Sequence, residues 1–184
     1  IENPFFGKNP LQSLDREMHH LFYARTFDFQ PEQGKDYLLS FEGIDTIADI
    51  YLNGSWIART ENMLMEHILE IEGDRFRTGE NELFVHIIPV SLEARKYDNP
   101  LFQNGLKYEM DSLNIRKSPY MFGWDIFPRM LSGGIWRSVT LTEKPQYAFL
   151  QSYLFTRNIE KDYSKCELEY FFEIELNDLP YHGF

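Results

Sequence analysis

The chain has 184 residues, of which 43% are hydrophobic and 16% aromatic, and its formal net charge is −11. This length exceeds the roughly 100–150 residues of one compact domain and falls short of two full ones. The acidic balance repels phosphate groups, which argues against nucleic acid and membrane surfaces as partners. Cys166 is the only cysteine, so neither an internal disulfide nor a cysteine-based zinc site can form.

Short strand patterns follow one another along most of the chain. They cover residues 22–29, 37–42, 48–52, 56–58, 68–71, 82–88 and 135–141. Asn53-Gly54 separates the third pattern from the fourth and predicts a tight hairpin, because a type I′ turn needs positive φ at both central positions. No stretch shows a convincing long helical period. The spacing of strands and turns predicts an all-β fold, a jelly-roll β-sandwich.

Residues 89–129 interrupt this regular spacing of strand patterns. Loops longer than about 15 residues without regular structure are uncommon and are usually functional or disordered. This segment is too aromatic for disorder, so we expect an ordered excursion that docks on another surface. Its aromatic residues are Tyr97, Phe102, Tyr108, Tyr120, Phe122, Trp124 and Phe127.

A boundary falls at Glu143-Lys144-Pro145, which divides the chain into residues 1–144 and 145–184. After it come a strand at 147–156 and a strict period of two at 166–176, with glutamates opposite Leu168, Tyr170, Phe172 and Ile174. Two strands are too few for a sandwich, which predicts a truncated second domain. Its bare edge and apolar face predict a homodimer or strand exchange through residues 147–176, or disorder near the end.

Catalytic and metal-binding patterns are weak. The glutamates at 167, 169, 173 and 175 share one strand face, whereas a glycosidase pair must flank a sugar from two sides, so we interpret them as a solvated face. The histidines, His19, His20, His67, His86 and His182, have no recognisable ligand spacing. Without a glycine-rich phosphate loop either, the sequence predicts no metal, no cofactor and no catalytic residue.

Trp124-Asp125, near the end of the long excursion, is the candidate substrate-binding pair. An indole covers the apolar C–H face of a sugar, and a neighbouring carboxylate accepts hydrogen bonds from two hydroxyls. A buried Trp beside a turn-forming Asp fits the same spacing. The spacing alone leaves both interpretations open.

A wider pattern resembles the front domain of family 2 glycoside hydrolases. It consists of residues 41–46, 48–54, 62–63, 79–83 and 134–141, and it covers about residues 4–143 in the expected order. Arg116-Lys117, residues 122–125 and Pro128-Arg129 are similar to the β-mannosidase branch. The usual form there is Trp-Asp-Trp-Gly-Pro, and Ile126 and Phe127 replace the second Trp and the Gly.

The resemblance implies the non-catalytic N-terminal part of a retaining exo-β-glycosidase, with a β-mannosidase as the expected parent, that acts on a terminal β-mannoside or a closely related carbohydrate. Its two catalytic glutamates would lie in a (β/α)₈ barrel further along the same polypeptide. Trp124 and Asp125 would line the −1 subsite, and Ile126 and Phe127 would reshape that wall. The strands from residue 146 would begin an immunoglobulin-like domain.

Two other functions remain open. One is the front domain of another family 2 enzyme, namely a β-galactosidase, β-glucuronidase or exo-glucosaminidase. The other is a stand-alone carbohydrate-binding module, a role that jelly rolls often serve. The first residue is Ile1, which indicates a removed leader or a trimmed sequence, and for a bacterial parent we expect a periplasmic or secreted location.

Overall fold

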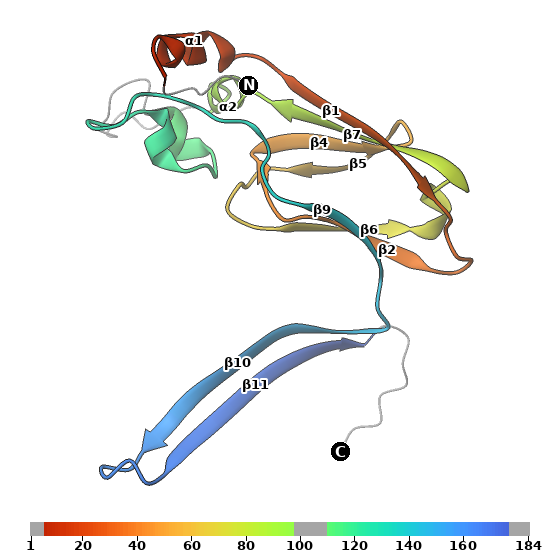
Figure 1. Ribbon diagram of the computed structural model, residues 1–184, viewed down its shortest axis with the longest axis vertical. Coiled ribbons are helices and arrows are strands. Elements are labelled where there is room, and N and C mark those ends of the chain that lie inside the picture. Colours follow the sequence, from red (N-terminus) through yellow and green to blue (C-terminus); the bar gives the residue numbers. More distant parts are fainter. Residues whose placement is uncertain (1–5, 98–109, 177–184) are drawn as a thin grey trace. The chain divides into compact units, whose positions relative to one another are not determined.

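The computed structural model describes residues 6–97 and 110–176 of the chain. The chain divides into two compact units, Ile1–Glu143 and Lys144–Phe184. Each unit is described below on its own terms, with the element labels of Figure 1.

The first unit is built mainly from antiparallel strands. These are β1 (Leu21–Phe29), β2 (Asp36–Phe41), β3 (Ile44–Asp45), β4 (Ile47–Leu52), β5 (Ser55–Thr60), β6 (His67–Glu72), β7 (Gly79–Ile88), β8 (Gly134–Ile135) and β9 (Val139–Glu143). The helical segments are α1 (Asn9–Arg16), η1 (Gly73–Arg75), α2 (Val90–Ala94), η2 (Met110–Asn114) and η3 (Pro119–Phe122).

Two sheets form the layers of this unit, in the orders β1-β7-β4-β5 and β6-β2-β9 (Figure 1). Alternate residues of β2, β4 and β7 point inward and enclose one hydrophobic core. Its fully buried members include Phe41, Ile50 and Val85. A third, two-stranded ladder pairs β3 with β8, and this ladder leads to the long excursion described below.

The predicted all-β sandwich is confirmed. The turn between β4 and β5 is also as predicted, with φ of 52° at Asn53 and 82° at Gly54. The helices α1 and α2 were not predicted, because each is too short to show a helical period. The predicted strand at 135–141 is wrong as a single element: β8 pairs with β3 and β9 with β2, and Trp136 to Ser138 separate them.

The second unit contains one antiparallel hairpin of β10 (Tyr147–Ile159) and β11 (Cys166–Leu176). Two irregularities, near Leu150 and Arg157, interrupt its register. The apolar side chains predicted on one face of β11 are exposed, since Leu168, Tyr170 and Phe172 each keep half or more of their surface accessible. The predicted disorder near the end falls on residues 177–184, which lie outside the described residues, as do Phe102 and Tyr108.

The described part of the chain contains neither a membrane-spanning helix nor a metal-binding cluster. None of its helices is long and apolar enough to cross a membrane. Across residues 6–97 and 110–176 there is also no cluster of three or more His, Cys, Asp or Glu side chains that could hold a metal ion.

Candidate functional site

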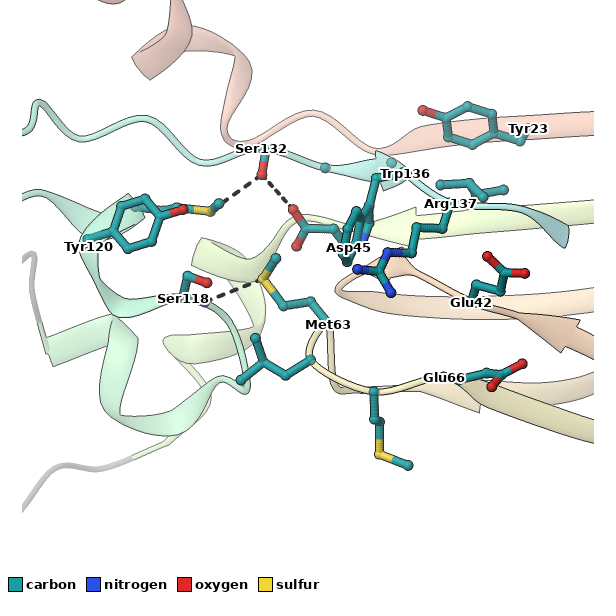
Figure 2. Close-up of a pocket in the computed structure, with 16 residues that line it drawn as sticks. Tyr23, Glu42, Asp45, Met63, Glu66, Ser118, Tyr120, Ser132, Trp136 and Arg137 are labelled. Atoms are coloured by element: carbon teal, nitrogen blue, oxygen red, sulfur yellow. Dashed lines mark hydrogen bonds between the residues drawn. The ribbon is translucent and has the colours of Figure 1, made fainter. Parts of the chain in front are cut away.

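The end of the long excursion, residues 115–132, forms an ordered projection that we call the arm. Both of its ends are fastened to one buried carboxylate on β3. Lys117 Nζ lies 2.6 and 2.5 Å from the two carboxylate oxygens of Asp45. At the other end, the Ser132 hydroxyl donates to Asp45 Oδ2 at 2.6 Å, a contact drawn in Figure 2. Lys117 Nζ also donates to the Ser132 carbonyl oxygen at 3.0 Å, so the two ends meet directly.

This fastening is deeply buried. The Lys117 side chain has no accessible surface, and that of Asp45 keeps 5%. Burial lowers the pKa of Lys117, and the attraction of Asp45 offsets only part of that effect. The Thr46 hydroxyl also donates to Asp45. A buried pair of this kind costs desolvation free energy, which its hydrogen bonds must repay, so it fixes geometry more than it adds stability.

A second cluster of polar side chains, centred on Arg129, also holds the arm in place. The Arg129 guanidinium donates to both carboxylate oxygens of Glu17, at 2.8 and 3.1 Å, and to Asp111 Oδ2 at 3.2 Å. It also donates to the Ser91 hydroxyl at 3.0 Å. Burial lowers the pKa of Arg129, but the bonds to the two carboxylates outweigh it and leave that pKa raised. A bidentate pair of this type fixes orientation as well as position.

Phe122 anchors the arm from beneath. Its side chain is fully buried in a second hydrophobic cluster with Ile47, Val90, Ala94 and Ile115. The Arg129 guanidinium lies 5.5 Å from the centre of the Phe122 ring. Full burial of a phenylalanine contributes about 1.5–3 kcal/mol. The arm therefore has a small core of its own, separate from the core between the two sheets.

The tip of the arm is a tight turn from Trp124 to Phe127. The Trp124 amide donates to the Phe127 carbonyl at 2.9 Å, and the Phe127 amide donates back at 3.2 Å. The chain enters this turn through Gly123, whose φ of 109° favours glycine. Asp125 and Ile126 thus occupy the two outermost positions of the turn.

The side chains of the tip divide into inward and outward ones. Trp124 is 65% exposed, Ile126 is 82% exposed, and Asp125 is exposed as well. Phe127 instead turns back onto the Tyr120 ring, edge to face at 5.4 Å. The alternative of a buried Trp124 is therefore wrong. Of the two residues expected to reshape the wall, only Ile126 faces outward.

Two hollows flank the arm. A smaller one of about 370 Å³ is lined by Ser112, Pro119, Tyr120, Gly123 and Trp124. A larger one of about 890 Å³ lies at the root of the arm, where Tyr120 is again part of the lining. Its wall comes from β1, the β2–β3 and β5–β6 connections, the arm and the segment leading into β9 (Figure 2).

The tip of the arm is recognisable in the sequence, whereas the residues that support it are not. Asp45, Lys117 and Arg129 stand out in the sequence only as members of motifs that resemble the family, and Glu17 and Ser132 belong to none of these motifs. Lys117 and Asp45 are 72 positions apart, and Arg129 and Glu17 are 112 apart. No local sequence pattern links residues that are so far apart. The one sequence feature that points to the buried pair is the position of Lys117 in a largely apolar, aromatic segment.

Fold and site together define a β-sandwich domain with a firmly mounted, solvent-facing aromatic and acidic tip. The family model of the glycosyl hydrolase 2 galactose-binding domain-like domain matches residues 1–137. The chain therefore belongs to this family. Its predicted resemblance to the β-mannosidase branch is confirmed by the relatives that follow.

A β-D-mannosidase from Dictyoglomus thermophilum is 33% identical, with a TM-score of 0.82 over 96% of this chain and 22% of that one. Beta-mannosidase B from Emericella nidulans is 28% identical over 95% of this chain and 21% of the relative. The exo-chitosanase CsxA of Amycolatopsis orientalis shares the fold at 16% identity and a TM-score of 0.61, over 95% of this chain and 18% of that one. The chain thus spans about a fifth of the length of the β-mannosidases it matches.

Proposed function

We propose that this chain is the non-catalytic N-terminal part of a retaining exo-β-glycosidase that removes a terminal β-mannose. In this proposal the arm contributes Trp124 and Asp125 to the −1 sugar pocket. The reacting carboxylates belong to a (β/α)₈ barrel elsewhere in the same polypeptide. The second unit is the beginning of an immunoglobulin-like domain that follows the jelly roll at residue 145.

The observation that carries the proposal is the exposure of Trp124 and Asp125 on a tip that is otherwise held rigidly. An indole with 65% of its surface accessible contributes little to the stability of its own domain, because most of its apolar area stays in water. The clusters around Asp45 and Arg129 nevertheless hold its turn in one place. A rigid support beneath an exposed aromatic and acidic pair is what a binding site requires, because immobilising side chains at the moment of binding costs affinity.

The chemistry of the pair suits a hexose. The Trp124 ring offers an apolar face for the C–H groups of one side of the sugar. The Asp125 carboxylate accepts hydrogen bonds, and charge-assisted bonds of this kind are about twice as strong as neutral ones. A carboxylate that accepts from two neighbouring hydroxyls also distinguishes epimers, since moving one hydroxyl breaks one bond.

The preference for mannose is supported by the relatives. Two β-glucuronidase structures share the fold at only 17–18% identity, whereas the β-D-mannosidase reaches 33% over almost the whole chain. The outward-facing Ile126 places an aliphatic group beside Asp125. We infer that it forms part of the wall around the sugar, while Phe127 supports the turn from behind.

An aryl glycoside panel tests the proposal. The full-length polypeptide that contains this chain should hydrolyse an aryl β-mannoside far faster than the matching β-galactoside, β-glucuronide or β-glucosaminide. The isolated 184-residue chain should hydrolyse none of them. Turnover by the isolated chain would contradict the non-catalytic role, and a preference for another sugar would contradict the substrate.

A further inference from the structure

The larger cavity at the root of the arm carries side chains that the proposed −1 site does not use. Arg137, Glu42 and Glu66 all line it, as do Tyr23 and Tyr120 (Figure 2). With the residues that the structure describes, the Arg137 guanidinium and both carboxylates form no ion pair or hydrogen bond. A concave site of about 890 Å³ with several unpaired polar groups has the dimensions and character of a small-molecule pocket.

The Arg137 guanidinium stacks on an aromatic ring, which restricts its orientation. Its guanidinium carbon lies 4.3 Å from the centre of the Trp136 ring. The same ring also lies against Gly43, so closely that a Cβ there would come within 2.6 Å of Trp136 Cε2. The Trp136 ring thus contacts both Gly43 and the Arg137 guanidinium. Stacking restricts the guanidinium while leaving its N–H donors available to a ligand.

The polar groups define the ligand. Arg137 only donates hydrogen bonds, whereas the carboxylates of Glu42 and Glu66 only accept them. A ligand that satisfies all three must both donate and accept, and two carboxylates beside one guanidinium disfavour an anion. The Tyr23 and Tyr120 rings and the thioethers of Met63 and Met65 add apolar contact surface. A neutral polyhydroxylated molecule, such as one sugar unit, fits this combination.

The position of the cavity connects it to the tip. Tyr120 lines both this cavity and the smaller hollow beside Trp124. In Figure 2 the arm residues Ser118 and Tyr120 form one end of the cavity, and Glu42 and Glu66 lie at the other. We propose that this cavity is a further saccharide subsite, in which Arg137, Glu42 and Glu66 bind a second sugar unit of a β-mannan oligosaccharide. This inference rests on the proposed function, because the first sugar unit is placed at Trp124 and Asp125.

Calorimetry with uncleavable ligands tests the subsite. The full-length protein is titrated with methyl thio-β-mannoside and with an S-linked β-1,4-mannotriose, neither of which a glycosidase cleaves. The trisaccharide should bind at least about tenfold more tightly, because it alone reaches the charged groups of the cavity. Arg137→Met, which keeps an aliphatic contact with Trp136, and Glu66→Gln should each remove most of this difference. Neither should change the affinity for the monosaccharide.

The same titrations distinguish failure of the further subsite from failure of the proposed −1 site at Trp124. If the trisaccharide binds no better than the monosaccharide, or if its advantage survives in both variants, the subsite is refuted. A variant that weakens both ligands equally would also refute it, since that is the effect of a general structural disturbance. Trp124→Ala should weaken both ligands. If it weakens neither while Arg137→Met still removes the difference, the subsite stands and the role of Trp124 at the −1 position fails.

Discussion

Lys117 Nζ and Asp45 Oδ2 lie 2.5 Å apart in the interior of the first unit, although 72 positions separate the two residues in the sequence. Asp45 belongs to the short strand β3, and Lys117 is near the start of the arm. Because Ser132 binds the same carboxylate, one buried group closes the loop of chain that carries Trp124 and Asp125. The arm is thereby an integral part of the jelly-roll unit.

Breaking this pair should strongly destabilise the chain. Lys117→Met leaves the Asp45 carboxylate buried without its cation, and loss of one partner of a buried pair costs about 3–5 kcal/mol. Urea unfolding followed by intrinsic fluorescence measures this free energy. Lys35→Met is the matched control, because Lys35 also pairs with a carboxylate, that of Glu143, but at the exposed surface. Equal effects of the two substitutions would contradict the structural role of Lys117.

Replacing both members of the buried pair should cost less than replacing one. Lys117→Met combined with Asp45→Asn removes the uncompensated charge, and apolar or neutral replacements of buried pairs are often close to neutral. We expect the double variant to recover at least about 1–2 kcal/mol relative to Lys117→Met alone. A strictly additive double variant would show that the two side chains do not interact in solution.

Releasing Arg129 should loosen the arm while the sheets stay intact. Arg129→Met removes the bonds to Glu17, Asp111 and Ser91, and a lost charged hydrogen bond costs about 1.5–3 kcal/mol. Amide hydrogen exchange should therefore accelerate in residues 119–131 and remain unchanged in β4 and β7. Arg157→Met, which breaks an exposed pair with Glu169, is the control and should leave the arm protected. Uniform acceleration across the sheets would argue against a local clamp.

Stability should depend on pH through His86. Burial and the neighbouring His20 lower the pKa of His86 below its ordinary value of 6.5, and Asp49 offsets this only in part. The unfolded chain therefore binds a proton more readily, so the free energy of unfolding is highest above pH 6.5 and decreases as the pH falls below it. Urea titrations across this range measure the slope. His86→Gln should flatten it and His20→Gln should flatten it partly; an unchanged slope in His86→Gln would refute the assignment.

Self-association is expected through the hairpin of β10 and β11. Phe172, Tyr170 and Leu168 are largely exposed, and strands with unpaired edges and apolar faces pair with other chains. Light scattering on the 184-residue chain should give twice the 22.0 kDa mass of one chain. Phe172→Glu should restore the single-chain mass, whereas Tyr163→Glu in the connecting turn should leave the dimer intact. A single-chain mass for the unaltered protein would contradict the expectation.

Most of the jelly roll could be predicted from local pattern, because strand alternation and turn residues act over short distances. Asn53-Gly54 indicated its hairpin correctly, as both residues adopt positive φ. The division of residues 134–143 into β8 and β9 was not predictable. No glycine or proline marks a break at residues 136–138, and the division follows from tertiary pairing, since β8 pairs with β3 and β9 with β2.

The candidate site could be predicted only in part. Trp124 and Asp125 stood out as a pair whose chemistry suits a sugar, but their exposure depends on buried contacts with residues far away in the sequence. A lysine such as Lys117 is normally expected at the surface, since burial of a charge is favourable only with a partner. The partner, Asp45, becomes visible only once β3 and the arm are placed side by side.

The kinetic effect of Asp125→Asn in the full-length polypeptide is the most direct test of the arm's role in the sugar pocket. Asn keeps the size of the side chain and removes its charge, so kcat/KM for an aryl β-mannoside should fall about 10- to 100-fold, while the melting temperature stays unchanged. Asp162→Asn, in the exposed turn between β10 and β11, is the matched control and should leave kcat/KM unaltered. If both variants hydrolyse the mannoside as fast as the unaltered enzyme, the tip of the arm does not bind the sugar.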